Sequence, residues 1–187
     1  MSAANDPALR RLVGGVLWPG YLGREVPGWL QRELGDGGLA GAVLFSHNLG
    51  GTDLAAAFRD LAPNLLVGID EEGGNVTRLE AATGSTLPGA AQLGQVDDPD
   101  ATTAVGRELA ARSLAAGANV VLAPVADVNT DPRNPVIGVR AFGSTPELVS
   151  RHVAAAVRGI QSAGAAACVK HFPGHGDTHL DSHLAVP

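Results

Sequence analysis

The sequence has few aromatic residues, a single cysteine, no cluster of basic residues and no long apolar run. Only 4% of its 187 residues are aromatic although 45% are hydrophobic, so we expect one domain with an aliphatic core. The lone cysteine, Cys168, excludes an intramolecular disulfide. Its apolar neighbours predict a buried and unreactive thiol.

The lack of a basic cluster and of a long apolar run also limits which partners the protein is expected to bind. The net charge is −6, and without a basic patch neither a nucleic acid nor an anionic membrane is an expected partner. No apolar run reaches membrane-spanning length, and residues 1–9 lack the basic-then-apolar order of a signal peptide. We therefore expect a soluble, cytoplasmic protein.

Short apolar runs alternate with helical patterns along the chain. The helical patterns cover residues 27–34, 54–61, 98–116 and about 144–163, with capping signals at Thr52 or Asp53, at Asp98 and in a possible Ser144/Glu147 capping box. This alternation predicts parallel strands joined by crossover helices. The predicted buried strands are Leu12–Leu17, Ala40–Phe45, Leu65–Ile69, Val120–Ala123 and Ala166–Val169.

Two α/β architectures fit this order, an open doubly wound sheet and a (β/α)8 barrel. Residues 18–23 read WPGYLG, which is not the dinucleotide fingerprint of the first. Long polar loops, residues 70–97, 124–143 and 171–187, follow strands three to five and favour a barrel with its site on that face. A closed barrel needs eight strands and about 250 residues. We expect a partial barrel of about five β/α units, one incomplete domain over residues 1–187.

The ends of strands three and four carry candidate ligand-binding residues. Asp70 opens the segment DEEGGNVTR, and a carboxylate there could accept hydrogen bonds from two sugar hydroxyls. The alternative is a solvated turn with a surface pair between Asp70 and Arg78. Arg140 could clamp a carboxylate or an amide oxygen of a ligand. Arg133 is a competing candidate, and either arginine could simply pin its loop.

Lys170 and His171 end strand five. Adjacent strand residues face opposite ways, so both can reach a ligand only if the chain bends, and residues 172–174 (FPG) could supply the bend. The alternative is a lysine that reaches solvent from the strand end.

Five titratable residues alternate in the last loop, with several interpretations open. They could ligate a metal such as zinc, or Asp181 and His183 could form an acid/base pair in which the carboxylate orients the ring. A disordered polar tail is the third interpretation. Spacing alone does not decide among them. The alternating residues are His175, Asp177, His179, Asp181 and His183.

Four segments together resemble the β-N-acetylhexosaminidase branch of the family 3 glycoside hydrolases. They are residues 70–74 (DEEGG) with Arg78, 134–140 (NPVIGVR), 170–176 (KHFPGHG) and 181–183 (DSH). The resemblance implies a (β/α)8 barrel that releases terminal N-acetylglucosamine with retention, without a cofactor or a metal. It implies His183 as acid/base and Asp181 as its orienting partner. The residues implied to hold the sugar are Asp70, Arg78, Arg140, Lys170 and His171.

The resemblance also implies a nucleophile, an aspartate after the seventh strand, to which no position of this chain corresponds. We therefore expect negligible turnover from the 187 residues alone. The implied partners are an N-acetylglucosamine-containing cell-wall fragment and a complementary C-terminal half. The alternatives are a non-catalytic sugar-binding or split-enzyme fragment and a metal-binding hydrolase that uses the His/Asp run.

Overall fold

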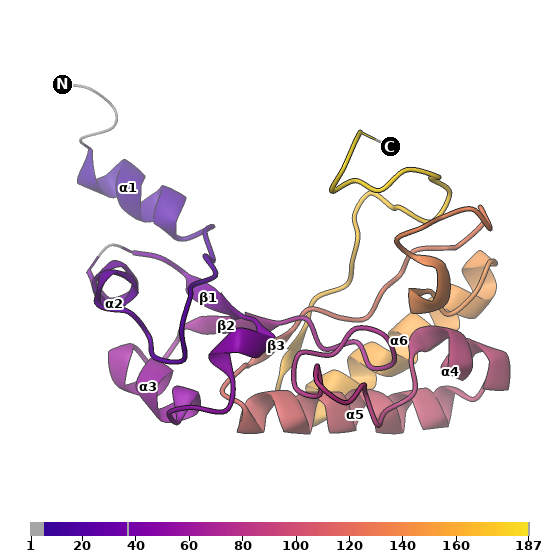
Figure 1. Ribbon diagram of the computed structural model, residues 1–187, viewed down its shortest axis with the longest axis horizontal. Coiled ribbons are helices and arrows are strands. Elements are labelled where there is room, and N and C mark those ends of the chain that lie inside the picture. Colours follow the sequence, from indigo (N-terminus) through magenta and orange to yellow (C-terminus); the bar gives the residue numbers. More distant parts are fainter. Residues whose placement is uncertain (1–5, 37, 187) are drawn as a thin grey trace.

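The computed structural model describes residues 6–36 and 38–186 and has an α/β fold built on one parallel sheet (Figure 1). The strands lie in the order β1-β2-β3-β4, which is also their order in the sequence. They are β1 (Gly41–Leu44), β2 (Leu66–Ile69), β3 (Val120–Val121) and β4 (Ala166–Ala167). The helices are α1 (Pro7–Gly14), α2 (Gly28–Gly35), α3 (Leu54–Leu61), α4 (Ala90–Val96), α5 (Pro99–Ala115) and α6 (Pro146–Ser162).

The sheet has the pairing of a partial (β/α)8 barrel. All three neighbouring pairs are parallel, with Gly41 opposite Leu66, Gly68 opposite Val120 and Val120 opposite Ala166. Helical segments connect each strand to the next, as right-handed β/α units require. The predicted fold class is confirmed, with four strands in place of the expected five. The carboxyl ends of β2, β3 and β4 therefore lie along one rim, which positions the loops that follow them.

The predicted first strand, Leu12–Leu17, is wrong. Residues 7–14 form helix α1, which has Pro7 in its first turn and an Asp6 side chain that accepts a hydrogen bond from the backbone N–H of Ala8. The apolar residues of this segment repeat at helical as well as strand spacing, so a short run does not distinguish the two. The chain reaches the sheet just after this segment, through an isolated parallel bridge between Gly20 and Val43 in which the Pro19 carbonyl accepts from the Val43 N–H at 3.1 Å.

The other helices follow their sequence signals more closely. Helix α3 has the predicted bounds, and Asp53 caps it by accepting from the Ala56 N–H at 3.0 Å. The Ser144/Glu147 capping box is wrong, because Thr145 occupies the cap position of α6 without a side-chain cap bond. Helix α4 lies inside a segment predicted as loop.

Across residues 6–36 and 38–186, no helix has the length and apolarity needed to cross a membrane.

The core lies mainly between the sheet and the helices and is largely aliphatic. Leu30 of α2 packs in one cluster with Leu44 and Ile69 of the sheet, and Ile160 of α6 packs in another with Val121. Cys168, however, is exposed, so the predicted buried thiol is wrong. The residue directly follows β4, the last strand in the order, where no further strand covers it.

Helices α5 and α6 lie along each other beneath the sheet (Figure 1) and meet through two glycines. A Cβ added at Gly159 would lie 2.2 Å from the carbonyl oxygen of Thr103, and one at Gly106 would lie 2.7 Å from that of Ala156. Real side-chain contacts are never that short, so these glycines set how closely the two helices approach.

Gly159→Ala should therefore destabilise the chain, by about 1–3 kcal/mol, because the added methyl group overpacks the interface between the two helices. Urea unfolding followed by circular dichroism measures the change. Gly35→Ala is the matched control, since a Cβ there meets nothing within 4 Å. Equal unfolding midpoints for the two variants would contradict the packing argument.

Candidate active site

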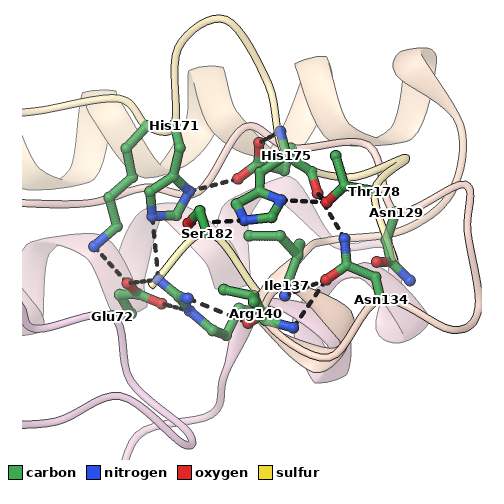
Figure 2. A network of polar contacts seen from close by, with 12 residues as sticks. Glu72, Asn129, Asn134, Ile137, Arg140, His171, His175, Thr178 and Ser182 are labelled. Atoms are coloured by element: carbon green, nitrogen blue, oxygen red, sulfur yellow. Dashed lines mark hydrogen bonds and ion pairs between the residues drawn. The ribbon is translucent and has the colours of Figure 1, made fainter. Parts of the chain in front are cut away.

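Five residues predicted to hold a sugar come together at the carboxyl ends of the strands. Asp70 directly follows β2, Arg140 ends a short 3-10 helix in the loop after β3, and Lys170 and His171 follow β4. Figure 2 shows Arg140 and His171 converging on Glu72 and its surroundings. The fifth residue, Arg78, joins through Asp70, to which its Nη2 donates at 3.3 Å.

A chain of ion pairs links these side chains. Lys170 Nζ lies 2.8 Å from Asp70 Oδ1 and 2.5 Å from Glu72 Oε1. The guanidinium of Arg140 binds Glu72 with both of its prongs, Nη2 to Oε1 at 2.8 Å and Nε to Oε2 at 2.9 Å. Such bidentate pairs fix orientation as well as charge. Because Glu72 already takes both prongs of Arg140, the arginine is not free to clamp a ligand carboxylate in the same way.

The formal charges of this cluster cancel. Asp70 and Glu72 pair with three cations (Arg78, Arg140, Lys170), and Asp127 pairs with the His171 ring, so the formal charges cancel when that ring is counted as neutral. A site for a phosphate or a carboxylate ligand would carry an excess of positive charge. The balanced cluster is instead suited to a neutral ligand rich in hydroxyl and amide groups.

Two aspartates of the cluster have displaced pKa values. Burial alone would raise the pKa of Asp70, but the bonds from Lys170 and Arg78 outweigh it and leave the pKa below its usual value. Burial opposes ionisation of Asp127 in the same way, and the bonds from the His171 ring and the His175 backbone lower its pKa overall. The pKa of the Arg140 guanidinium is raised, first by its bond to Glu72. Asp70 and Asp127 are therefore ionised at neutral pH.

The turn that carries Asp70 and Arg78 is not a solvated surface turn. The side chain of Glu71 is buried and accepts from the backbone N–H of Arg78 at 2.7 Å and of Leu79 at 3.1 Å. The guanidinium of Arg78 lies over the ring of Phe45, 5.9 Å from its centroid. Lys170 does not extend into solvent either, since its side chain is 14% exposed.

Two members of the cluster, Glu72 and Asp127, were not predicted as site residues from the sequence. The only available signal was their position, since each is an acid that follows an apolar strand by a few residues. Asp127 is 3% exposed, and its Oδ2 lies 2.6 Å from Nδ1 of His171. Sequence position alone cannot show that a carboxylate is buried against a particular partner.

Asp181 and His183 form the predicted pair, and the pair lies on the surface. Asp181 Oδ1 accepts from the His183 backbone N–H at 2.8 Å and contacts its ring Nδ1 at 2.7 Å. These two bonds, the backbone one first, lower the pKa of Asp181. The His183 side chain is 79% exposed. Within the described part of the chain, neither side chain has a hydrogen bond to the cluster around Glu72.

The remaining interpretations of the last loop receive no support. His175 does not point toward a shared metal position but contacts Thr178 through Nδ1 and Ser182 through Nε2 (Figure 2). Among residues 6–36 and 38–186, no group of three or more His, Cys, Asp or Glu side chains could hold a metal ion. The base of the loop is hydrogen-bonded to the 124–143 loop, unlike a free polar tail.

The family model of the glycosyl hydrolase family 3 N-terminal domain matches residues 30–187. The chain belongs to this family. A β-hexosaminidase A of Pseudoalteromonas piscicida is 39% identical over 80% of the chain and 27% of its own length. A β-hexosaminidase of Stenotrophomonas maltophilia is also 39% identical, over 83% of the chain and 49% of its own length.

Solved structures agree with the family. A family 3 β-N-acetylglucosaminidase from a Paenibacillus species is 40% identical, with a TM-score of 0.85 over 94% of this chain and 35% of that protein. Native NagZ from Neisseria gonorrhoeae is 34% identical, with a TM-score of 0.78 over 91% of this chain and 53% of NagZ. The resemblance to glycosidases of this branch is thus confirmed. This family 3 chain spans about half, or less, of the length of these relatives.

The lowered pKa of Asp70 predicts an acid-sensitive fold. A carboxyl group whose pKa is lower in the folded than in the unfolded chain contributes stability above its unfolded pKa of about 4. That contribution is lost as the pH falls through the lower, folded pKa. The free energy of unfolding should therefore drop below about pH 4, and less steeply in Asp70→Asn than in the unmodified chain.

Urea unfolding between about pH 2 and pH 6 measures this slope. Asp60→Asn is the matched control, because Asp60 is an exposed residue of α3 away from the cluster. Identical slopes in the two variants would contradict the assignment to Asp70.

Proposed function

We propose that the protein binds the terminal N-acetylglucosamine of a glycoside and supplies the sugar-binding and acid/base residues of a retaining β-N-acetylhexosaminidase. The observation that carries this proposal is the convergence of Asp70, Arg140, Lys170 and His171 in one charge-balanced cluster. NagZ of Neisseria gonorrhoeae, 34% identical, has been solved with N-trifluoroacetyl-D-glucosamine, a ligand of the same kind. The substrate we propose is a cell-wall fragment ending in this sugar.

The cluster offers the groups that a neutral sugar needs. Asp70 is a carboxylate with two acceptor oxygens, each already held by one cation, and it is partly exposed. Lys170 has three N–H donors, of which its contacts with Asp70 and Glu72 use two. The remaining donor and the free lone pairs of Asp70 can pair with sugar hydroxyls. The ion pairs hold these groups in position before the ligand arrives.

His183 and Asp181 have the arrangement of an acid/base pair. Asp181 Oδ1 is placed to hold the proton of His183 Nδ1, which leaves Nε2 to exchange a proton with substrate. In a retaining reaction the acid first protonates the leaving oxygen while a nucleophile attacks the sugar. The same group then removes a proton from the water that releases the sugar. The pair lies on the loop after β4 and would close over the bound sugar.

The nucleophile implied by the family resemblance follows the seventh strand and has no counterpart among these residues. We therefore propose that residues 1–187 act as part of a barrel domain that a complementary C-terminal segment completes. The two ends of the strand order, β1 and β4, are the edges against which further strands would pair. Leu12, Val16 and Leu22 are 73%, 78% and 86% exposed, and a completed barrel would cover such side chains.

Arg140→Lys should weaken binding of N-acetylglucosamine by about tenfold or more, because lysine cannot make the bidentate bond that orders Glu72. Ligand-observed NMR titration of the 187-residue chain measures the dissociation constant. Arg133→Lys is the matched control: Arg133 lies on the same loop and pairs only with Asp131. Equal affinities in the two variants, or no binding by the unmodified chain, would contradict the proposed site.

The 187-residue chain alone should release no chromophore from a chromogenic N-acetylglucosaminide. Co-expression with the C-terminal part of the Paenibacillus relative should restore turnover, because the family resemblance implies that this part carries the remaining strands and the nucleophile. In the restored enzyme, His183→Ala should lower kcat by about 10²–10⁴-fold, as for loss of a general acid/base.

His179→Ala, a change to an exposed histidine of the same loop, is the control for that variant and should retain most of the activity. Full turnover by the 187-residue chain alone would overturn the missing-nucleophile argument. Equal losses in the His183 and His179 variants would overturn the acid/base assignment.

A further inference from the structure

Asp127 joins two parts of the site through one buried carboxylate. Its Oδ2 lies 2.6 Å from Nδ1 of the His171 ring, and its Oδ1 accepts from the backbone N–H of His175 at 2.7 Å. The side chain is 1% exposed, so water cannot replace either partner. A buried carboxylate with two short bonds holds its partners more firmly than an exposed one does.

The contacts of His171 assign its tautomer. An ionised carboxylate only accepts hydrogen bonds, so Nδ1 of His171 carries the proton that is donated to Asp127. On the other side of the ring, Arg140 Nη2 lies 3.3 Å from Nε2. A guanidinium only donates, so Nε2 offers its lone pair. Both neighbours thus favour the same tautomer, and the 2.6 Å bond to the ionised Asp127 is much the stronger of the two.

The second bond of Asp127 fixes the base of the last loop. The backbone of His175 is held at both polar groups, since its carbonyl oxygen also accepts from Asn134 Nδ2 at 2.6 Å. At Gly176 the chain approaches the 124–143 loop so closely that a Cβ would lie 2.0 Å from the carbonyl oxygen of Val128. No other residue type fits this position, which fixes the path of the loop.

The side chain of His175 links the fixed base of the loop to residues nearer its tip. Its Nδ1 contacts Thr178 Oγ1, and its Nε2 lies 3.1 Å from Ser182 Oγ. Because the Thr178 hydroxyl donates to the His175 carbonyl at 3.1 Å, it accepts from Nδ1, and Ser182 donates to Nε2. Ser182 lies directly between Asp181 and His183.

We propose that Asp127 is a positioning residue that couples the ring of His171 to the loop bearing Asp181 and His183. It sets the His171 tautomer and, through the His175 backbone, holds the base from which the loop extends. The roles of His171 in sugar binding and of His183 in proton transfer rest on the proposed function. The tautomer and the anchoring of the loop do not.

Histidine ring NMR of the ¹⁵N-labelled 187-residue chain, recorded without sugar at a pH where the rings are neutral, tests the first part. The unmodified chain should show the His171 proton on Nδ1. In Asp127→Asn it should move to Nε2, because the amide NH2 donates to Nδ1 while the amide oxygen keeps the bond from His175. This short bond at Nδ1 outweighs the longer contact of 3.3 Å between Arg140 Nη2 and Nε2. Asp131→Asn, on the same loop and paired with Arg133, is the matched control and should leave His171 unchanged.

Amide hydrogen exchange tests the second part. The His175 amide should exchange about fivefold faster in Asp127→Asn, because the charge-assisted bond becomes a neutral one. Exchange in Asp131→Asn should match the unmodified chain. An unchanged His175 rate in Asp127→Asn would overturn the coupling to the loop.

A His171 ring protonated at Nε2 in the unmodified chain would overturn the proposal, and so would an Asp127→Asn variant with the original tautomer. If that variant does not fold, the tautomer in the unmodified chain decides alone. Both experiments are done without sugar. A failure to bind N-acetylglucosamine would therefore contradict the proposed function and leave this inference unaffected.

Discussion

The site depends on the ion pairs that Glu72 makes with Arg140 and Lys170. The Glu72 side chain is 7% exposed, and each of its two oxygens meets at least one cation. Leaving such a charge without its partner costs on the order of 3–5 kcal/mol, so the segments after β2, β3 and β4 that carry the three residues must lie in one arrangement. The ion pairs therefore specify the position of the loops as much as they stabilise them.

The same pairs decide what the site can recognise. A cluster whose charges cancel attracts no anion over a distance, but it presents fixed donors and acceptors to a ligand that brings hydroxyls and amides. Asp70 and Lys170 retain unused hydrogen-bonding capacity, whereas Arg140 already makes four hydrogen bonds with its guanidinium. The proposed recognition of a neutral sugar rests on this division between residues that hold the site together and residues that remain open toward a ligand.

The two ends of the molecule differ in how firmly the sheet holds them. The rim formed by β2, β3 and β4 is tied together by ion pairs and by the bridge between Val125 and Lys170. At the other end, residues 7–14 form helix α1, in which Leu9, Leu12 and Val13 are exposed, and the chain joins β1 through the isolated bridge of Gly20 to Val43. A segment that lacks a strand neighbour satisfies its backbone within a helix instead.

The sequence by itself determined the alternation of strands and helices, the bounds of α3, the start of α5 and five of the polar residues that meet at the carboxyl ends of the strands. Local signals were sufficient there: a capping aspartate, a proline in the first turn, and polar groups directly after apolar runs. Sequence could not separate helix from strand at residues 12–17, because a short apolar run fits both periods. Only the tertiary structure decided that Cys168 is exposed, that Glu72 and Asp127 belong to the cluster, and that Glu72 binds Arg140 through both carboxylate oxygens. The contacts of the site join side chains that are 44 to 100 residues apart in the sequence. A local sequence pattern does not show which of these distant side chains are in contact.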